Sequence, residues 1–183
     1  MNANTEKKLL KRIRGCRRGS VFVPNLFLDR GTRAAIDKAL SRLTADGTIR
    51  RLARGVYDYP KTHPTIGLLS PAPDAVAKAI AGRDRTTLQP TGAYAANLLR
   101  LSEQIPARIV YLTNGPARSI RIGKMTIQLR QTTQRNMATA GRLSGLIIQA
   151  FRYLGKEYIT TGRITTLNQC PIGFRDITQI PLH

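Results

Sequence analysis

The acidic residues of the chain are few and scattered, which limits the catalytic chemistry that it can support. Among 183 residues there are 10 Asp and Glu. The acids after residue 60 are Asp74, Asp84, Glu103, Glu157 and Asp176. No two of them have the spacing of a metal site or of a general acid–base couple. We therefore expect no catalytic residues, no bound metal and no other cofactor.

A metal-dependent nuclease is the enzyme class that we considered for these acidic residues. Asp84 precedes a predicted strand, Thr86–Gln89, as the first carboxylate of a metal-dependent nuclease would. Such a core also needs a second carboxylate and a lysine on the next strand, where this chain offers Gln128 and Arg130. The GxxxxGK pattern of a phosphate-binding loop is absent as well. A nuclease fused to a DNA-binding domain is thus the least supported of our three hypotheses.

The thiols and imidazoles assemble no recognisable site either. Cys16 and Cys170 lie far apart in the sequence and match no zinc or disulfide framework. We interpret them as two reduced thiols of a cytoplasmic protein. With His63 and His183 as the two histidines, we expect neither a zinc site nor a His-based catalytic triad.

Positive charge is the chemistry that the chain does offer. It has 30 Lys and Arg and a formal net charge of +20, which attracts nucleic acid or an anionic membrane surface. We find no apolar run long enough to span a bilayer and no signal-peptide pattern, so we expect nucleic acid as partner, no membrane, and a cytoplasmic location. Residues 1–60 hold 14 Lys and Arg against 5 acids, and residues 61–183 hold 16 against 5. Charge alone therefore does not locate the binding site.

The stretch Gly31–Tyr59 carries the side chains best suited to contact a polyanion. It predicts a helix, a turn at Asp46-Gly47 and a two-stranded hairpin. Helical spacing places five apolar residues on one buried stripe: Ala35, Ile36, Ala39, Leu40 and Leu43. Thr32 precedes the helix and can cap it.

An arginine-rich hairpin follows this helix. Its predicted strands, Thr48–Leu52 and Val56–Tyr59, are joined through Ala53-Arg54-Gly55. Two helices are predicted upstream, Thr5–Ile13 with Thr5 as N-cap, and Asn25–Asp29. Leu26 and Phe27 of the second should pack beneath the helix that follows.

Helices followed by a cationic ribbon are the pattern of a winged helix-turn-helix. In such a domain one helix enters the major groove, while the ribbon reaches a phosphate strand or the minor groove. Side chains that approach a polyanion closely should be small or cationic. We therefore predict the following DNA-binding residues: Thr32, Arg33, Lys38, Ser41, Arg42, Arg50, Arg51 and Arg54.

The predicted fold class is α+β, an N-terminal winged helix-turn-helix over residues 1–60 followed by a small α/β domain over residues 65–183. The Pro-rich segment Pro60–Pro64 marks the boundary, with His63 as a linker residue. The second domain should hold strands at 86–89, 108–113, 119–122 and 125–130, and helices at 74–81, 92–101 and 141–154. The segment from Gly155 onward has weak periodicity and predicts loose or partly helical structure.

Four segments in this order resemble the AbiEi-like antitoxins, the regulator halves of type IV toxin–antitoxin (abortive infection) systems. They are GTRAAIDKALSRLTADGTIRRLARGVYDYP, TTLQPTGAYAANLLRL, PARIVYLTNGPARSIRIGKMTIQLRQ and GRLSGLIIQAFRYLG. The resemblance covers about residues 5–156. It implies a repressor whose winged helix binds inverted repeats at its own promoter. It also implies a C-terminal domain that counteracts a nucleotidyltransferase-like toxin, without necessarily forming a stable complex with it.

The main alternative is a basic RNA- or ribosome-associated binding protein. The net charge of +20 fits that function equally well. The order of helices and ribbon argues for double-stranded DNA instead. Aromatic residues are also scarce, at 5% with no Trp, whereas proteins that stack single-stranded bases depend on them.

Overall fold

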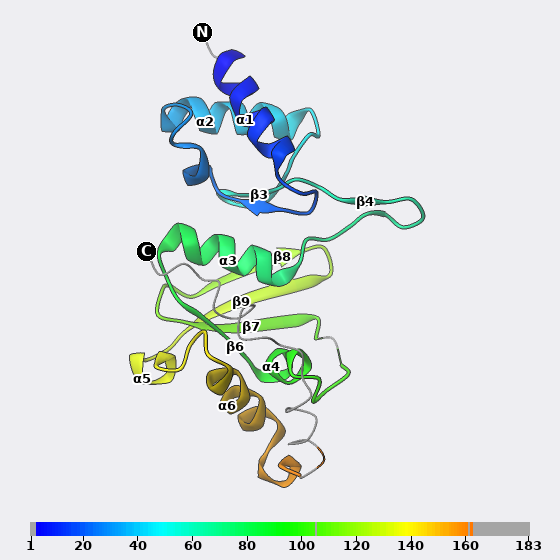
Figure 1. The fold of residues 1–183 in the computed structure, drawn as a ribbon, viewed down its shortest axis with the longest axis vertical. Helices are drawn as coiled ribbons and strands as arrows, with labels where there is room; N and C mark the ends of the chain where they lie inside the picture. Colours follow the sequence, from blue (N-terminus) through cyan, green and yellow to red (C-terminus); the bar gives the residue numbers. More distant parts are fainter. Residues whose placement is uncertain (1–2, 105, 161, 163–183) are drawn as a thin grey trace. The chain divides into compact units, whose positions relative to one another are not determined.

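The computed structural model describes residues 3–104, 106–160 and 162, and it mixes helices with several small sheets (Figure 1). The chain divides into two compact units, Met1–Arg83 and Asp84–His183. The division lies later than Pro60–Pro64, where the sequence placed it. The segment there forms strand β4 (Thr62–His63), which pairs with β5 (Gly67–Leu68) in an antiparallel hairpin.

The first unit alternates helices with short strands. In chain order these are α1 (Ala3–Gly15), β1 (Val21–Phe22), the 3₁₀ helix η1 (Pro24–Phe27), α2 (Arg33–Ala45), β2 (Arg50–Ala53) and β3 (Val56–Asp58). The three strands form an antiparallel sheet in the order β1-β3-β2, so the first strand joins the hairpin made by the other two. The hairpin β4–β5 and the helix α3 (Pro73–Asp84) follow.

One apolar core holds the helices and the sheet of this unit together. Its buried members are Leu9, Ile13, Phe22, Phe27, Ile36, Ala39, Leu40, Leu43, Ile49 and Tyr57. The Phe22 ring lies edge-on to Phe27, with centroids 5.5 Å apart, and stacks on Tyr57 at 6.3 Å. The predicted stripe of α2 is confirmed at four of its five positions, while Ala35 is half-buried.

The start of the chain departs from the predicted helix boundaries. Helix α1 begins at Ala3, so Thr5 lies inside it and is not its N-cap. Thr5 lies beside Gly31 instead, because a Cβ built at Gly31 would meet the Thr5 methyl group at 3.1 Å. The predicted helix Asn25–Asp29 is the shorter η1, which buries Phe27 but leaves Leu26 44% exposed.

The turn after α2 is confirmed. Gly47 has a φ of +76°, a backbone conformation that favours glycine. Asp46 ends the helix, and its Oδ1 accepts a hydrogen bond from the Thr48 backbone N–H at 2.9 Å. That hydrogen bond lowers the pKa of Asp46, because it stabilises the ionised carboxylate.

The second unit is built on a four-stranded sheet. Its elements are β6 (Leu88–Thr91), α4 (Gly92–Leu98), β7 (Arg108–Thr113), β8 (Arg118–Ile122), β9 (Met125–Gln131), α5 (Gln134–Met137), α6 (Leu143–Leu154) and the 3₁₀ helix η2 (Lys156–Tyr158). The strand order is β6-β7-β9-β8, with β7 and β9 parallel and the other pairs antiparallel.

Helix α6 packs against α4 and against strand β6 (Figure 1). Leu146 and Ala150 of α6 meet Ala96 and Leu99 in a buried cluster. The amphipathic pattern predicted this helix and its role in covering the sheet. Among the described residues, no helix is both long and apolar enough to cross a membrane. Cys170, Asp176 and His183 lie outside the described residues.

Candidate nucleic-acid interface

Helix α2 exposes its polar face to solvent, because its apolar stripe is buried in the core of the first unit. Thr32 is the N-cap, as predicted, and its Oγ1 accepts a hydrogen bond from the Ala35 backbone N–H at 3.4 Å. Lys38 and Ser41 are exposed, and within the described part of the chain their side chains make no hydrogen bond or ion pair. The fold therefore leaves one small hydroxyl and one cation available on this face.

The guanidinium of Arg33 is held at the N-terminal end of α2 by two partners. Its Nε lies 2.9 Å from Oδ2 of Asp37, one helical turn further on, and its Nη1 donates to Oδ1 of Asn25 in η1 at 2.9 Å. The side chain is nonetheless 54% exposed. Arg33 is thus fixed in direction while its outer edge faces solvent.

Arg42 is tied to the first helix. Its Nη1 lies 3.2 Å from Oε2 of Glu6 in α1, and about half of the Arg42 side chain is exposed. Local sequence patterns could not predict this pair, because its members are 36 residues apart in the chain. The contact is single and solvent-accessible, so Arg42 can leave it at little cost.

Arg50, also predicted to bind DNA, has a guanidinium that is engaged within the fold. Its Nε and Nη2 reach the two carboxylate oxygens of Asp58, at 3.1 and 2.6 Å. Nη2 also donates to the Leu69 carbonyl at 3.1 Å. Because Asp58 is almost fully buried, the pair fixes β2, β3 and the segment after β5. Sequence reasoning missed Asp58, because a regular hairpin closed at Arg54-Gly55 would place Tyr59 opposite Arg50, and the register shift between Arg51 and Ala53 brings Asp58 there instead.

Arg51 and Arg54 are the exposed cations of the β2–β3 hairpin. Gly55 closes the hairpin with a φ of +68°, and a shift in register between Arg51 and Ala53 bends β2. The Arg54 carbonyl accepts a hydrogen bond from Arg83 Nη1 at 2.8 Å, which anchors the backbone of the turn. The backbone is fixed, and the Arg54 side chain remains exposed.

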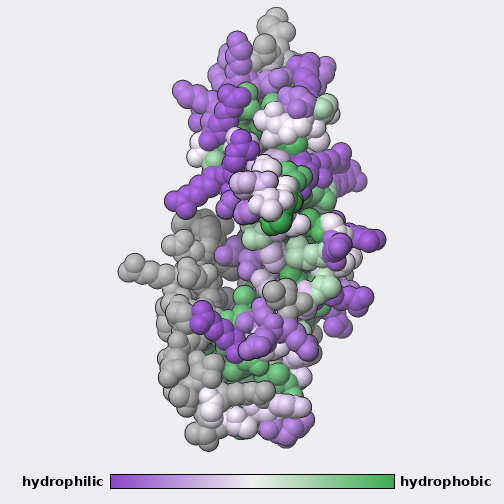
Figure 2. Space-filling model, turned by 90° about the vertical axis from the view of Figure 1, so that its right-hand side faces the viewer, coloured by the Kyte–Doolittle hydropathy of each residue, from purple (hydrophilic) through white to green (hydrophobic). Residues whose placement is uncertain are grey.

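The first unit carries further exposed cations, which were not among the predicted DNA-binding residues. Exposed ones on α1 are Lys7, Lys8, Lys11, Arg12 and Arg14. Arg18, in the loop before β1, stacks over the Tyr59 ring at 4.8 Å and donates to the Pro60 carbonyl. Figure 2 shows hydrophilic side chains crowding the surface of the N-terminal unit, at the top of that view.

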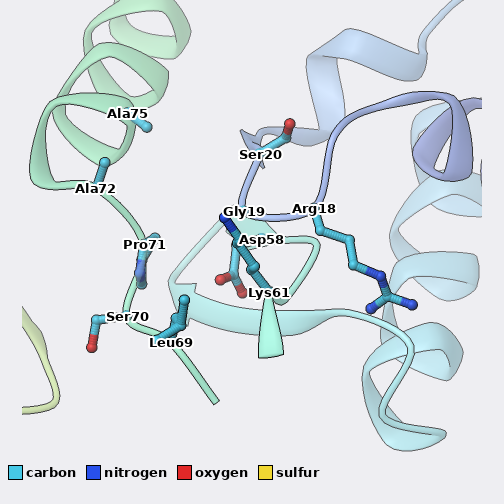
Figure 3. A pocket seen from close by; sticks show the side chains of 10 residues that line it. All are labelled: Arg18, Gly19, Ser20, Asp58, Lys61, Leu69, Ser70, Pro71, Ala72 and Ala75. Carbon is cyan, nitrogen blue, oxygen red and sulfur yellow. The ribbon is translucent and has the colours of Figure 1, made fainter. Parts of the chain in front are cut away.

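A pocket of about 420 Å³ opens beside the sheet of this unit (Figure 3). It is lined by Arg18, Gly19, Ser20, Asp58, Lys61, Leu69, Ser70, Pro71, Ala72 and Ala75. The Asp58 carboxylate in it is already neutralised by Arg50, which leaves Arg18 and Lys61 as its uncompensated charges. The Arg18 side chain extends away from Ser70 and Ala72 (Figure 3), so the two cations do not converge on one point.

The second unit carries cations on its sheet. Arg108, Arg121 and Arg130 are exposed, and the register aligns Arg108 and Arg121 on either side of Thr126. Asp84, the acid considered for a nuclease, pairs instead with Arg118, whose Nη2 lies 3.2 Å from its Oδ2. Within residues 3–104, 106–160 and 162, no three His, Cys, Asp or Glu side chains gather as metal ligands.

Comparisons with known proteins found a match to a protein-family model. No curated protein and no solved structure matched the chain. A family model described as a family of unknown function, DUF6088, matches residues 8–170, which include all elements of both units from the middle of α1 to η2. The chain therefore belongs to the DUF6088 family.

Proposed function

We propose that the protein is a DNA-binding transcriptional repressor whose first unit is a winged helix-turn-helix. The observation that carries the proposal is the succession α1, β1, η1, α2, β2 and β3 with the sheet order β1-β3-β2. In a winged helix, a helix equivalent to α2 enters the major groove, and a hairpin equivalent to β2–β3 contacts the backbone or minor groove beside it.

The side chains on these elements fit their proposed roles. Base edges are contacted from the N-terminal part of a recognition helix, where Thr32 and Arg33 lie, and Lys38 follows in the same half of α2. The hairpin offers Arg51 and Arg54 to phosphates, whose contacts fix orientation without reading sequence. Arg50 supports the hairpin and is left out of the proposed interface.

The second half of the proposal rests on the sequence resemblance over residues 5–156. It assigns autorepression through promoter inverted repeats to the first unit. It assigns neutralisation of a nucleotidyltransferase-like toxin to the second unit, without necessarily requiring a stable complex. We propose no enzymatic activity, because the acid singled out for catalysis, Asp84, is engaged by Arg118. Purified protein incubated with Mg²⁺ or Mn²⁺ should leave DNA and RNA intact.

A footprint on the DNA upstream of the protein's own gene tests the repressor function. Protection of two repeated half-sites supports it, and competition by the same sequence but not by random DNA shows specificity. For the antitoxin function, co-expression of the full chain with a toxin encoded beside it should restore growth. A chain with Arg33 and Arg54 replaced by Ala should lose promoter binding and keep that rescue.

An RNA- or ribosome-associated role is the second candidate, and one observation favours it. Arg108, Arg121 and Arg130 lie exposed on the sheet of the second unit, which is not among the elements proposed to bind DNA. Cations on a sheet surface suit a polyanion of any kind. Tighter binding to structured RNA than to the upstream DNA at equal salt, lost when these arginines become Ala, would establish this role.

A further inference from the structure

One acidic residue lies on the face of α2 that we propose binds DNA, where the DNA phosphates would repel it. Asp37 lies on the exposed side of α2, between Arg33 and Lys38 in the proposed recognition surface, and it is about half exposed. A carboxylate close to DNA opposes binding electrostatically. Its contact with Arg33 Nε at 2.9 Å is of the exposed i,i+4 kind, which contributes little to helix stability. Stability alone is therefore a weak reason for Asp37 to be there.

The geometry around Arg33 supplies a stronger reason. Asp37 accepts a hydrogen bond from the Nε–H, and Asn25 accepts one from an N–H of Nη1. A guanidinium has five N–H donors, so three remain, two on Nη2 and one on Nη1. Two adjacent donors are what a bidentate contact with O6 and N7 of guanine requires. The partners thus restrain the side chain while leaving a recognition edge free.

We propose that Asp37 and Asn25 are positioning residues that hold Arg33 as a preformed bidentate donor for a guanine in the major groove. This inference rests on the proposed DNA-binding function and adds its source of sequence preference. A flexible arginine loses rotamer freedom when it docks, whereas a restrained one has lost that freedom already. The repulsion from Asp37 acts on all DNA, and its benefit appears only where Arg33 meets guanine.

The two effects of Asp37 predict changes of opposite sign in Asp37→Asn. Binding to random DNA should strengthen, because one negative charge is gone. Binding to the preferred site should weaken by about tenfold, a loss within the range of one good bidentate pair. Asn25→Ala removes the second support without a change of charge, so it should weaken binding to the preferred site alone.

A selection from a random DNA pool with the full chain gives the preferred site without knowledge of the operator. Affinities are then measured on that site and on the same site with 7-deazaguanine, which lacks the N7 acceptor, at the selected guanine. The wild-type chain should lose about tenfold in affinity on the modified site. The Arg33→Ala variant should bind the selected site and the modified site with equal affinity. For Asp37→Asn, the modification should lower the affinity much less than it does for the wild-type chain.

Glu6→Gln is the matched control. It also removes a negative charge, partly exposed, that pairs with an arginine of α2, namely Arg42, but leaves the Arg33 contacts untouched. It should therefore strengthen binding to random DNA and keep the full sensitivity to 7-deazaguanine. An unchanged unfolding midpoint of Asp37→Asn and Asn25→Ala would show that these losses are not losses of fold.

The outcomes separate this inference from the function on which it rests. If the wild-type chain selects no sequence, the DNA-binding function fails and the inference fails with it. If it selects a sequence but Asp37→Asn keeps the same preference and the same sensitivity to 7-deazaguanine, the function stands and the positioning role is overturned. Equal losses on preferred and random DNA would also overturn it.

Discussion

Arg50 and Asp58 face each other across the β2–β3 hairpin, with Arg50 Nη2 2.6 Å from Asp58 Oδ2 and Nε 3.1 Å from Oδ1. Asp58 is 1% exposed, whereas the Arg50 side chain is 29% exposed. The arginine is thus committed to a buried carboxylate and also reaches the Leu69 carbonyl. Because of this pair, replacing Arg50 should lower the stability of the fold, whereas replacing the exposed Arg51 or Arg54 should not.

Replacing Arg50 by Ala should destabilise the first unit strongly. It leaves the buried Asp58 carboxylate unpaired, and breaking such a pair costs about 3–5 kcal/mol of unfolding free energy. Denaturant unfolding of the full chain measures this loss. Arg51→Ala, on the next residue and exposed, is the control and should stay within about 0.5 kcal/mol of wild type. Similar small losses for both variants would contradict the structural role of Arg50.

Replacing Arg54 by Ala should weaken DNA binding without changing sequence preference. In the proposed interface this exposed arginine at the tip of the hairpin contacts a phosphate, so DNA binding by the variant should release about one counterion fewer. The slope of log affinity against log salt should fall by about 1 on specific and random DNA alike. Arg152→Ala, an exposed arginine of α6 in the other unit, should leave the slope unchanged. A wild-type slope for Arg54→Ala would remove the hairpin from the interface.

Arg42 should contribute sequence preference once it leaves Glu6. We expect Arg42→Ala to cost about 1–3 kcal/mol on the preferred site and much less on random DNA, because base contacts are lost only on the former. Glu6→Gln frees the arginine and should not reproduce that cost. Competition binding on both kinds of DNA measures the difference. Equal losses from Arg42→Ala on both would show that Arg42 touches phosphate alone.

Gly145 tests the packing of α6 in the second unit. A Cβ there would overlap the Thr139 carbonyl oxygen and lie 2.7 Å from Oε1 of Gln89, which is buried. Gly145→Ala should therefore destabilise by about 1–3 kcal/mol through overpacking. Gly82→Ala in α3 meets open space and should stabilise by about 0.5–1 kcal/mol. Thermal unfolding compares them, and a gain in both would show that α6 has room to shift.

Regular patterns in the sequence predicted much of the fold. The apolar stripe of α2 and the strand at Arg108–Thr113 follow from local periodicity, and both are found where they were expected. The insertion of β9 between β7 and β8, parallel to β7, was not predicted. Local patterns fix which residues extend, but tertiary packing decides which strands pair.

For the candidate site, too, local patterns predicted some features, while others arise only from tertiary packing. Exposed cations on α2 and the hairpin could be named from composition and spacing, and Thr32 from its capping chemistry. The partners that hold them could not, because Asn25 and Glu6 lie on other elements and meet α2 only after folding. Pro60–Pro64 marked a boundary by composition, whereas hydrogen bonds from Arg50 to Leu69 and from Arg83 to Arg54 join the later segment to the first unit.

The most direct test of DNA recognition is a footprint of the full chain on the DNA upstream of its own gene, at physiological salt. We predict protection of two repeated half-sites centred about one helical turn, or a small multiple of it, apart. Arg33→Ala should abolish that pattern at concentrations where the wild-type chain protects it. Uniform binding along the fragment, with the same affinity as for random DNA, would contradict a specific repressor.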